Sequence, residues 1–352
     1  MLEELIRSWD GQEVVVGFDK PSGTWMFVCI HSTRLGPAGG GTRMKSYAQP
    51  SDGLRDAMNL SEAMTLKMAA AGIPFGGAKA VVAVPSLPQG AERRRILLRY
   101  ADLAASLGET FHTGPDVNTS TADMDVIAER HANVYCRSAS NGGSGDPGPY
   151  TARGVFHGLR ASVRHAFGSA NLDGRTVLVQ GVGDVGGPLA EQLAADGASV
   201  LVSDVDGERA QAVAARIGAE VVAPEGALDT ECDVYAPCAL GGTLTAETIP
   251  RLRCRVVAGC ANNQLSSPQD SDHLRDAGIL YAPDFVINAG GVLYAWGSES
   301  LGWDLDTVAT RLEGIGVTLL EIYARAESQG IGTNAAAEDL ARRRATGEPW
   351  SA

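Results

Sequence analysis

Two lysines and one aspartate in the N-terminal half have the residue types and neighbours that proton-transfer chemistry needs. Lys67 lies on the apolar side of a predicted helix, and Lys79 ends the run Gly-Gly-Ala-Lys just before an apolar strand. A lysine between glycines and a buried strand is poorly solvated, which disfavours its ammonium form and makes it a usable base near neutral pH. Asp116 follows Gly-Pro at the end of a short predicted strand, where it would face a cleft. The alternatives are lysines that extend into solvent and an aspartate that caps a turn.

A glycine pattern in the second half is typical of a dinucleotide site. A predicted strand runs into Gly-x-Gly-x-x-Gly, and a helix is predicted to follow. Gly181 would make the tight turn, Gly183 would let the backbone approach a pyrophosphate, and Gly186 would let the helix pack closely on the strand. The next predicted strand ends at Asp204, about 20 residues further on, where a carboxylate binds the ribose 2′-OH and repels a 2′-phosphate. The sequence therefore predicts NAD rather than NADP.

The elements that must position these residues differ between the two halves of the chain. In the first half the patterns predict strands at 13–17, 25–31, 80–84 and 111–113, and helices at 49–71, 91–107 and 121–130. In the second half strands are expected at 176–180, 199–203, 220–222, 233–237, 255–259 and 279–282, and helices at 151–167, 185–196, 209–217, 306–328 and 335–345. Strands that alternate with helices are typical of a parallel, doubly wound sheet.

The predicted fold is α/β with two domains and a deep cleft between them. A segment rich in Gly, Ser and Pro at 138–149 indicates a boundary. We expect a substrate (oligomerisation) domain at 1–145, completed by the C-terminal residues 331–352, and a Rossmann-type NAD-binding domain at 146–330.

Composition excludes several classes of protein. The chain has 352 residues and a formal net charge of −13, which argues against binding to nucleic acid or to an anionic membrane. No apolar run of about 18 residues occurs, so no transmembrane helix is expected. The six cysteines form no C-x-x-C pair. We therefore expect reduced thiols, a cytoplasmic protein and no metal site.

The order of the motifs along the chain resembles the glutamate/leucine/phenylalanine/valine dehydrogenase family. The resemblance covers about residues 10–345 and includes, besides the glycine fingerprint, the segments 35–43, 64–67, 76–79, 114–119, 122–125, 236–241, 259–263 and 282–291. The segment Gly-Pro-Asp-Val-Asn-Thr at 114–119 is similar to that of the phenylalanine dehydrogenases. One departure is Ala78, where relatives commonly have a third glycine before the lysine.

The resemblance implies reversible NAD-dependent oxidative deamination of an L-amino acid to a 2-oxo acid and ammonia. By this resemblance Lys67 would bind the substrate α-carboxylate, Lys79 would act as the general base that activates water, and Asp116 would shuttle a proton to and from the amine. The other substrate-binding residues implied are Gly39, Gly40, Gly41, Met64, Gly114, Pro115, Asn262, Asn288, Val292 and Ala295. The cofactor-binding residues implied are Thr151, Gly181, Gly183, Asp184, Val185, Gly186, Asp204, Ala236, Cys238, Ala239, Ala261 and Asn262.

Small residues at the expected side-chain pocket favour an aromatic substrate. Glutamate-specific relatives carry a lysine where this chain has Gly39, so glutamate is disfavoured. Branched-chain relatives carry larger residues at the positions of Gly39 and Gly114, and Ala295 is also small. The space left suggests phenylalanine first, with tryptophan or tyrosine as further candidates. The alternatives are a leucine or valine dehydrogenase that keeps Val292 in its pocket, an enzyme for a nonstandard amino acid, and a non-catalytic NAD-binding sensor. A homo-oligomer of unspecified size is expected.

Overall fold

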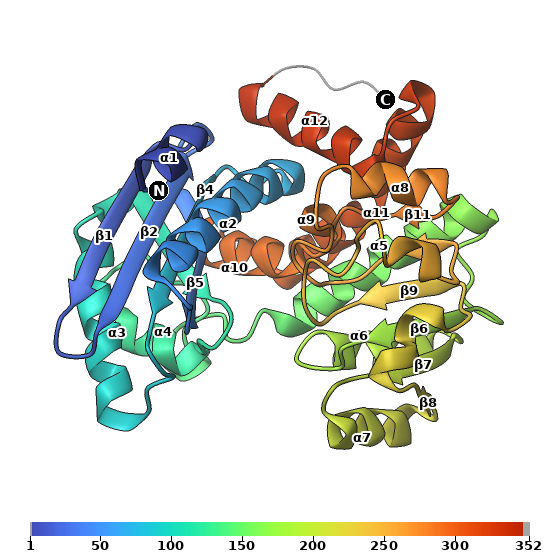
Figure 1. Cartoon of the computed structure of the whole chain (residues 1–352), viewed down its shortest axis with the longest axis horizontal. Coiled ribbons are helices and arrows are strands. Elements are labelled where there is room, and N and C mark those ends of the chain that lie inside the picture. The colour runs from blue at the N-terminus through green and yellow to red at the C-terminus, as the bar shows by residue number, and fades with distance from the viewer. Residues whose placement is uncertain (1, 348–352) are drawn as a thin grey trace. The chain divides into compact units, whose positions relative to one another are not determined.

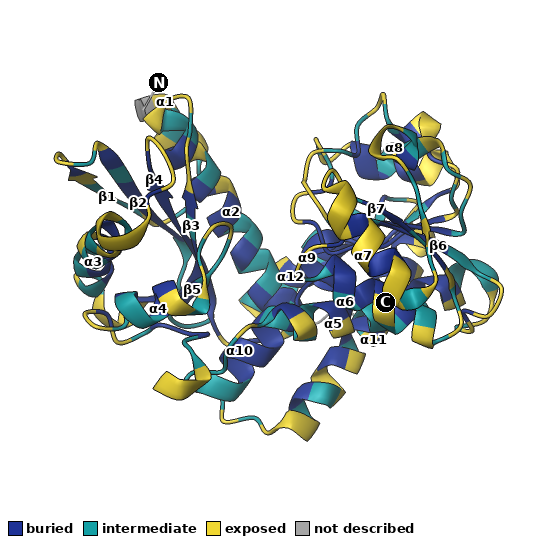
Figure 2. Ribbon diagram, turned by 90° about the horizontal axis from the view of Figure 1, so that it is seen from below, coloured by how far each residue is buried: buried dark blue, intermediate teal, exposed yellow. Residues whose placement is uncertain are grey.

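The computed structural model describes residues 2–347, which group into two compact units (Figure 1). Unit 1 contains the chain up to Asp146 together with Ala295–Gly302 and Ala345–Gly347. Unit 2 contains Pro147–Tyr294 and Trp303–Arg344. In each unit a sheet forms the buried centre, and the helices that cover it expose their outer faces (Figure 2).

Unit 1 is built on a five-stranded mixed sheet of order β1-β2-β4-β3-β5. Its strands are β1 (Glu13–Asp19), β2 (Thr24–Ser32), β3 (Ala38–Lys45), β4 (Gly76–Ala83) and β5 (Phe111–Pro115). The strand β2 is antiparallel to β1 and β4, whereas β3 is parallel to β4 and β5. The helix α2 (Pro50–Ala71) packs on one face of the sheet, and α3 (Gly90–Ala105) and α4 (Thr121–Ile127) pack on the other. The result is a three-layer α/β/α unit.

The strand β3, which lies between β4 and β5, was not predicted from the sequence. Its first half is Ala38-Gly-Gly-Gly, and glycine disfavours strands because it has no side chain to pack. The structure shows why glycine is needed. A Cβ atom at Gly40 would lie 1.7 Å from the carbonyl oxygen of Ala78, so β3 and β4 approach each other as only glycine allows. The predicted strand at 80–84 also begins earlier, at Gly76, so that Lys79 lies inside a strand in which every residue is buried.

Unit 2 is a six-stranded, wholly parallel sheet of order β11-β10-β9-β6-β7-β8. The strands are β6 (Thr176–Gln180), β7 (Ser199–Ser203), β8 (Glu220–Val221), β9 (Val234–Pro237), β10 (Val256–Val257) and β11 (Leu280–Tyr281). The chain moves outward from β6 to β8 and then returns to the other side of β6. In such sheets ligands bind at this point of reversal, beyond the carboxyl ends of the strands. The predicted doubly wound parallel sheet is confirmed.

Helices complete both units. Unit 2 contains α5 (Gly148–Phe167), α6 (Gly186–Ala195), α7 (Gly207–Ile217), α8 (Asp270–Asp276), α9 (Asp284–Ile287), α11 (Leu305–Gln329) and nearly all of α12 (Thr333–Thr346). The helix α1 (Leu2–Ser8) belongs to unit 1, and α10 (Gly290–Ser300) begins in unit 2 and ends in unit 1. No pattern in the sequence predicts α1, α8, α9 or α10.

Residues 331–352 were expected to complete the substrate domain. In the structure this segment groups with unit 2 up to Arg344. The Thr333 hydroxyl donates to the carbonyl oxygen of Tyr281 at 2.7 Å, and the backbone N–H of Asn334 donates to Ser271 Oγ at 3.1 Å. Both bonds hold the start of α12 to unit 2. Residues 348–352 lie outside the described residues.

Membrane spans and the state of the cysteines are described for residues 2–347. No helix there is long and apolar enough to cross a membrane. The six cysteines are all free thiols in the structure.

Candidate active site

Lys79 and Asp116 form a buried ion pair in unit 1. Lys79 Nζ donates to Asp116 Oδ2 at 2.5 Å, and the two side chains are only 5% and 13% exposed. Lys79 lies in β4, and Asp116 directly follows β5. The strand β3 lies between them. Both residues were singled out from the sequence, and the structure brings them into direct contact.

The contact across β3 depends on Gly41. A Cβ atom at Gly41 would lie 2.9 Å from Asp116 Cβ and 3.4 Å from Lys79 Nζ, so any side chain there would occupy the path of the ion pair. Gly41 pairs with Gly114 of β5, which likewise has no side chain. The glycine motif of β3 therefore leaves the space in which the lysine reaches the carboxylate.

Arg43 is a second cation at Asp116 and was missed as a site residue. Arg43 Nε donates to Asp116 Oδ1 at 2.7 Å, and Arg43 Nη1 donates to Asp56 Oδ2 at 3.0 Å. The Tyr47 hydroxyl donates to the same Asp56 oxygen at 2.5 Å. Arg43 lies two residues after Gly41 in β3, on the same face of the strand. This alternation was the signal that could have found it, but β3 itself was not predicted.

The two cations keep the Asp116 carboxylate ionised. Burial favours the neutral carboxyl, but the charges and hydrogen bonds of Lys79 and Arg43 outweigh it and hold the pKa of Asp116 well below its usual range. From the sequence, Lys79 is predicted to be an uncharged base in a dry site. Asp116 is predicted to carry a proton to and from the amine. The structure instead pairs them, so the burial of Lys79 is compensated by a carboxylate and Asp116 is a weak base in this arrangement.

The expected substrate-binding residues of unit 1 lie on or next to the face of the sheet that carries Lys79 and Asp116. Lys67 and Met64 lie on α2, which packs on this face; Lys67 is half-buried and Met64 is buried. Their neighbour Met68 reaches Gly39, because a Cβ atom at Gly39 would lie 2.9 Å from Met68 Cε. Pro115 is the last residue of β5, and its carbonyl oxygen lies 2.8 Å from the Cβ position of Gly41.

The space beside Gly39 and Gly114 is occupied by Trp296. A Cβ atom at Gly39 would lie 2.8 Å from Trp296 Nε1, and one at Gly114 would lie 3.8 Å from Trp296 Cη2. Trp296 follows Ala295 in α10 and is 5% exposed. The sequence analysis did not single out this residue.

The glycine fingerprint of unit 2 has the geometry expected of a phosphate-binding turn. Gly181 has a φ of +94°, a left-handed conformation that favours glycine. A Cβ atom at Gly186 would lie 1.9 Å from the carbonyl oxygen of Gly181, so the start of α6 packs tightly on the turn. A Cβ atom at Gly183 would meet no heavy atom within 4 Å, so the backbone there faces open space. A cavity of about 380 Å³ adjoins Gly183 and Asp184.

Asp204 lies at the carboxyl end of the neighbouring strand β7 and holds the same turn. Its Oδ2 accepts from the backbone N–H of Val182 at 2.9 Å, and its Oδ1 accepts from Asp206 at 2.9 Å. Arg209, which lines the cavity beside Gly183, approaches Asp204 Oδ2 to 3.6 Å. The carboxylate is therefore held in place beside the turn, where the sequence predicts that it would bind a ribose hydroxyl.

The remaining expected cofactor residues lie on the same edge of the sheet. Ala236, Cys238 and Ala239 span the carboxyl end of β9, and a Cβ atom at Gly181 would lie 2.7 Å from the Ala239 side chain. The backbone N–H of Ala261 donates to the carbonyl oxygen of Pro237 at 2.9 Å. Val185 is the residue that precedes α6.

The amide residues expected at the nicotinamide end form a connected group. Asn288 Nδ2 donates to Asn262 Oδ1 at 2.8 Å and to the carbonyl oxygen of Cys260 at 3.1 Å. Thr151 packs against Gly291, whose Cβ position is 2.6 Å from Thr151 Oγ1, and Val292 is the next residue of α10.

Three buried polar atoms at or next to these strand ends fit a dinucleotide. Gln180 Oε1, Ser203 Oγ and Asn288 Oδ1 have no hydrogen-bond partner among the residues of the described chain. Buried polar atoms are normally paired, so unpaired ones at a strand edge indicate a polar ligand. Gln180 and Ser203 end β6 and β7, which places them beside the phosphate-binding turn and Asp204. With the open backbone at Gly183, they make this edge suited to NAD.

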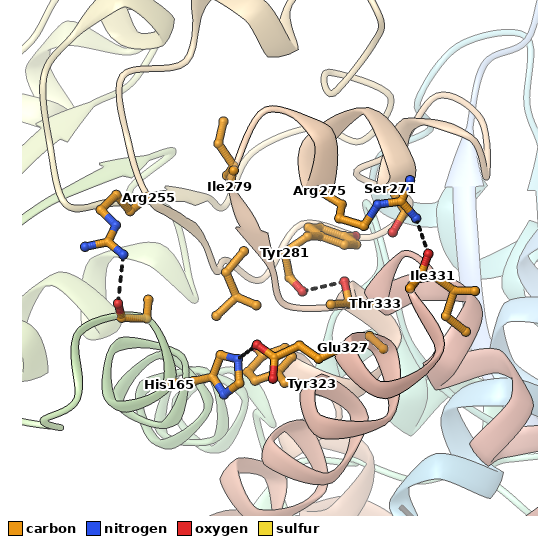
Figure 3. Close-up of a pocket in the computed structure, with 15 residues that line it drawn as sticks. His165, Arg255, Ser271, Arg275, Ile279, Tyr281, Tyr323, Glu327, Ile331 and Thr333 are labelled. Atoms are coloured by element: carbon orange, nitrogen blue, oxygen red, sulfur yellow. Dashed lines mark hydrogen bonds and ion pairs between the residues drawn. The ribbon is translucent and has the colours of Figure 1, made fainter.

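A second cavity of unit 2 lies on the opposite edge of the sheet (Figure 3). Its volume is about 470 Å³, and its lining includes Arg255 and Ile279, which precede β10 and β11. His165 and Glu327 point toward each other there and pair at 2.9 Å. Because the strands are parallel, this cavity is distinct from the cofactor edge, and we assign it no ligand.

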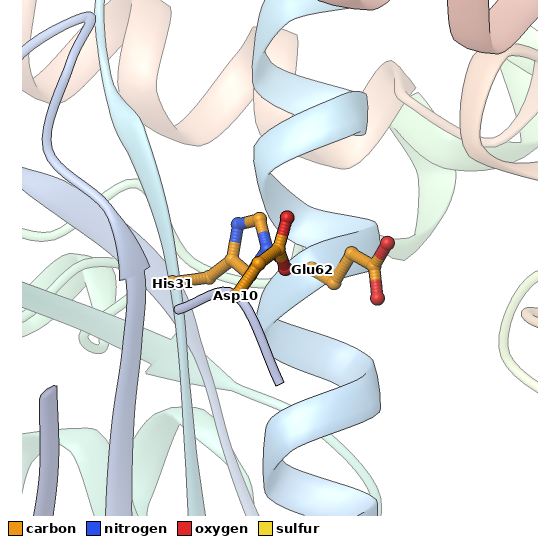
Figure 4. Close-up of side chains that lie close together, drawn as sticks. All are labelled: Asp10, His31 and Glu62. Atoms are coloured by element: carbon orange, nitrogen blue, oxygen red, sulfur yellow. The ribbon is translucent and has the colours of Figure 1, made fainter. Parts of the chain in front are cut away.

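A possible ligand cluster in unit 1 consists of Asp10, His31 and Glu62, whose side-chain ligand atoms lie within 4.8 Å of one another (Figure 4). His31 Nε2 contacts Asp10 Oδ1 at 2.9 Å, and its Nδ1 contacts Thr65 Oγ1 at 2.9 Å. Both ring nitrogens thus have protein partners, and we assign no metal to this cluster.

Comparisons with known proteins match both units of the chain. Residues 20–133 match the model of the Glu/Leu/Phe/Val dehydrogenase dimerisation domain. Residues 142–212 and 208–345 match the Glutamate/Leucine/Phenylalanine/Valine dehydrogenase model. The chain is 42% identical over 342 residues to a leucine dehydrogenase of Bacillus cereus, covering 97% of this chain and 92% of that protein. It is 43% identical over 349 residues to a valine dehydrogenase of Streptomyces albus, covering 98% and 95%.

The solved structure of an L-tryptophan dehydrogenase from Nostoc punctiforme is also similar. Its TM-score is 0.80 at 38% sequence identity, over 98% of each chain. The chain therefore belongs to the glutamate/leucine/phenylalanine/valine dehydrogenase family and is an NAD-dependent amino-acid dehydrogenase.

Proposed function

We propose that the chain catalyses the reversible oxidative deamination of a small aliphatic, branched-chain L-amino acid. In the forward direction the amino acid, NAD⁺ and water give a 2-oxo acid, ammonium, NADH and a proton. The observation that carries the choice of substrate is the indole of Trp296 beside Gly39 and Gly114.

This proposal replaces the aromatic substrate expected from the sequence. That expectation assumed that the missing side chains of Gly39 and Gly114 leave room for the substrate. A buried indole beside both glycines takes up that room, because its atoms lie 2.8 Å and 3.8 Å from their Cβ positions. An aromatic side chain would have to displace Trp296, whereas leucine or valine needs less space. Relatives named leucine and valine dehydrogenases support the same choice.

The chemistry would be divided between the charged groups of unit 1 and the bound cofactor. NAD, when bound, accepts the hydride from the substrate Cα. Lys67 would bind the α-carboxylate. Lys79 would give and take the protons of the amine and of the attacking water, while the Asp116 carboxylate would hold its Nζ in place through one short hydrogen bond. Arg43 would position Asp116 without contacting the substrate.

A substrate panel tests the proposal. The purified enzyme is given NAD at alkaline pH with leucine, valine, isoleucine, phenylalanine or tryptophan, and NADH absorbance is followed. We expect the highest kcat/KM for leucine or valine. Phenylalanine or tryptophan ahead by tenfold would overturn the aliphatic proposal; the tryptophan dehydrogenase from Nostoc punctiforme makes tryptophan the sharpest competitor.

The non-catalytic alternative is tested with Lys79→Ala. If the chain is an enzyme that uses this lysine, the variant loses at least ~100-fold in kcat, the usual contribution of acid–base catalysis. Lys45→Ala is a matched control, because Lys45 is an exposed lysine at the end of β3. Turnover that survives Lys79→Ala would remove Lys79 from the mechanism.

We also propose that unit 1 carries the contacts of a homo-oligomer. Residues 20–133 match a domain described as a dimerisation domain. The sheet-edge strand β1 exposes Val16 and Phe18, at 48% and 47%. Edge strands with apolar side chains are suited to association. Light scattering should give more than one chain per particle for the native protein, and Phe18→Asp should weaken the assembly.

A further inference from the structure

The indole N–H of Trp296 is a buried donor that nothing in the described chain uses. Trp296 is 5% exposed, and its Nε1 has no hydrogen-bond partner among residues 2–347. Leaving a buried donor unpaired costs about 1–3 kcal/mol. A phenylalanine would fill most of the same space without that cost. An unpaired tryptophan N–H at this position therefore suggests a ligand that accepts its hydrogen bond.

This donor lies on the same face of the sheet as the Lys79–Asp116 pair. It is 2.8 Å from the Cβ position of Gly39, and Lys79 Nζ is 3.4 Å from that of Gly41. Residues two apart in a strand point to the same face and are separated by about 7 Å. The far end of the indole approaches Gly114, which pairs with Gly41 in the neighbouring strand. The ring therefore reaches across from Gly39 of β3 to Gly114 of β5, the strand that Asp116 follows.

The side-chain atoms that pack beside the N–H at Gly39 are uncharged. The atoms nearest the Cβ position of Gly39 are Trp296 Nε1, Met68 Cε and Trp296 Cζ2. The ring of Tyr135 lies 4.7 Å from that of Trp296. An α-carboxylate requires a cation, and no cation is among these neighbours. The position thus suits the side chain of a substrate whose amine is at Lys79.

Tyr135, whose ring packs on the indole, and His112 beside it are both hydrogen-bonded. The Tyr135 hydroxyl bonds with His112 Nδ1 at 2.7 Å and with Ser300 Oγ. His112 Nε2 is 3.2 Å from the carbonyl oxygen of Glu109. Tyr135 and His112 thus have partners of their own, and neither accepts a hydrogen bond from the indole N–H.

We propose that Trp296 donates this hydrogen bond to an uncharged acceptor on the substrate side chain, such as a hydroxyl, carbonyl or amide oxygen at the β or γ carbon. The enzyme would then accept small polar amino acids of branched-chain size at least as well as their hydrocarbon counterparts. The inference rests on the proposed function, because it names the class of substrate within it.

The test compares substrates of matched shape. Threonine has a hydroxyl where valine has one of its methyl groups. Asparagine has a carboxamide where leucine has an isopropyl group. With the native enzyme and NAD, we expect kcat/KM for threonine or asparagine to equal or exceed that of its partner. A preference of more than tenfold for both hydrocarbons would overturn the inference, since a purely apolar pocket rejects the polar member.

A variant then isolates the N–H. Trp296→Phe should lower the threonine-to-valine or asparagine-to-leucine ratio of kcat/KM by about tenfold, which corresponds to one net hydrogen bond of about 1.4 kcal/mol. Trp9→Phe is the matched control, because Trp9 Nε1 is also buried without a partner among the described residues and lies outside the site. An unchanged ratio in Trp296→Phe, or an equal loss for all four substrates, would assign the indole a packing role only. If none of the substrates reduces NAD, the proposed function itself fails, which is a different result.

Discussion

Replacing Asp116 by asparagine should separate the chemistry of the ion pair from its contribution to stability. Asparagine has nearly the same shape and keeps one acceptor oxygen, but it removes the negative charge. Lys79, whose side chain is 5% exposed, then has no carboxylate at this position, whereas Arg43, at 13%, keeps its bond to Asp56 at 3.0 Å. Removing one member of a buried ion pair costs about 3–5 kcal/mol, because the remaining charge stays buried. Arg43 keeps Asp56 as a partner, so the loss falls mainly on Lys79 and the lower part of this range is expected.

The effect on catalysis should exceed the effect on folding. Asp116 Oδ2 accepts from Lys79 Nζ at 2.5 Å and fixes the direction of the ammonium. Loss of a positioned acid–base group lowers rates by about 100-fold or more. We therefore expect Asp116→Asn to remain folded at 25 °C, with a lower urea midpoint and kcat/KM reduced at least ~100-fold.

A matched control exists on the other face of the same sheet. Asp123 of α4 accepts from Arg93 Nε and Nη2 at 2.7 and 2.8 Å, and its side chain is 8% exposed. Asp123→Asn should lower the urea midpoint and leave kcat/KM within threefold. Urea unfolding and NADH-coupled rates are measured on both variants. If Asp116→Asn keeps kcat/KM within threefold of the native enzyme, the ion pair is structural and our mechanism is wrong.

Three further predictions follow from the same geometry. Gly39→Ala should destabilise the fold by about 1–3 kcal/mol in urea unfolding, because its Cβ would lie 2.8 Å from Trp296 Nε1, whereas Gly114→Ala, with its nearest atom at 3.8 Å, should cost less than about 1 kcal/mol. Asp204→Ala should raise KM for NAD by about 10- to 100-fold, the value of charged hydrogen bonds of about 1.5–3 kcal/mol, with a smaller change in kcat; an unchanged KM would contradict its role. The folded-state pKa of Asp116 is below the unfolded value of 3.8, so its stabilisation is complete above pH 3.8 and is lost as pH falls below it. Unfolding of Asp116→Asn should accordingly depend less on pH below 3.8 than unfolding of the native protein, measured at constant ionic strength.

The fold was predictable where the sequence pattern reflects local requirements. The strands β6 and β7 were predicted with their observed bounds, because apolar β-branched runs end at a glycine turn and at an aspartate. The strand β3 was missed, because its glycines are dictated by the approach of the Ala78 carbonyl on another strand. The helix α10 was missed as well. Its sequence, Gly-Gly-Val-Leu-Tyr-Ala-Trp-Gly, begins with glycines and lacks a clear amphipathic period, since most of its side chains are buried.

The residues of the candidate site were likewise predictable only where the local sequence pattern indicates them. Lys79 and Asp116 were recognisable because each stands beside glycine or proline at the end or start of an apolar strand. Arg43 was not recognised, because its role depends on the alternation of an unpredicted strand. The mutual dependence of Lys79 and Asp116 could not be predicted either, since 37 residues separate them in the chain and β3 lies between them.

The choice of substrate shows why absent side chains are weak evidence for empty space. Gly39 and Gly114 do leave volume beside β3, but a volume in a protein interior is filled by whichever side chain reaches it. Here the side chain comes from Trp296, more than 150 residues further along the chain. Filling the space with an aliphatic or phenyl group would have completed an apolar pocket. The indole brings one donor that no residue of the described chain satisfies, so the same substitution that makes the pocket smaller also makes it polar at one point. Size and polarity of the substrate are therefore set together by Trp296, and the paired substrates with Trp296→Phe separate these two effects.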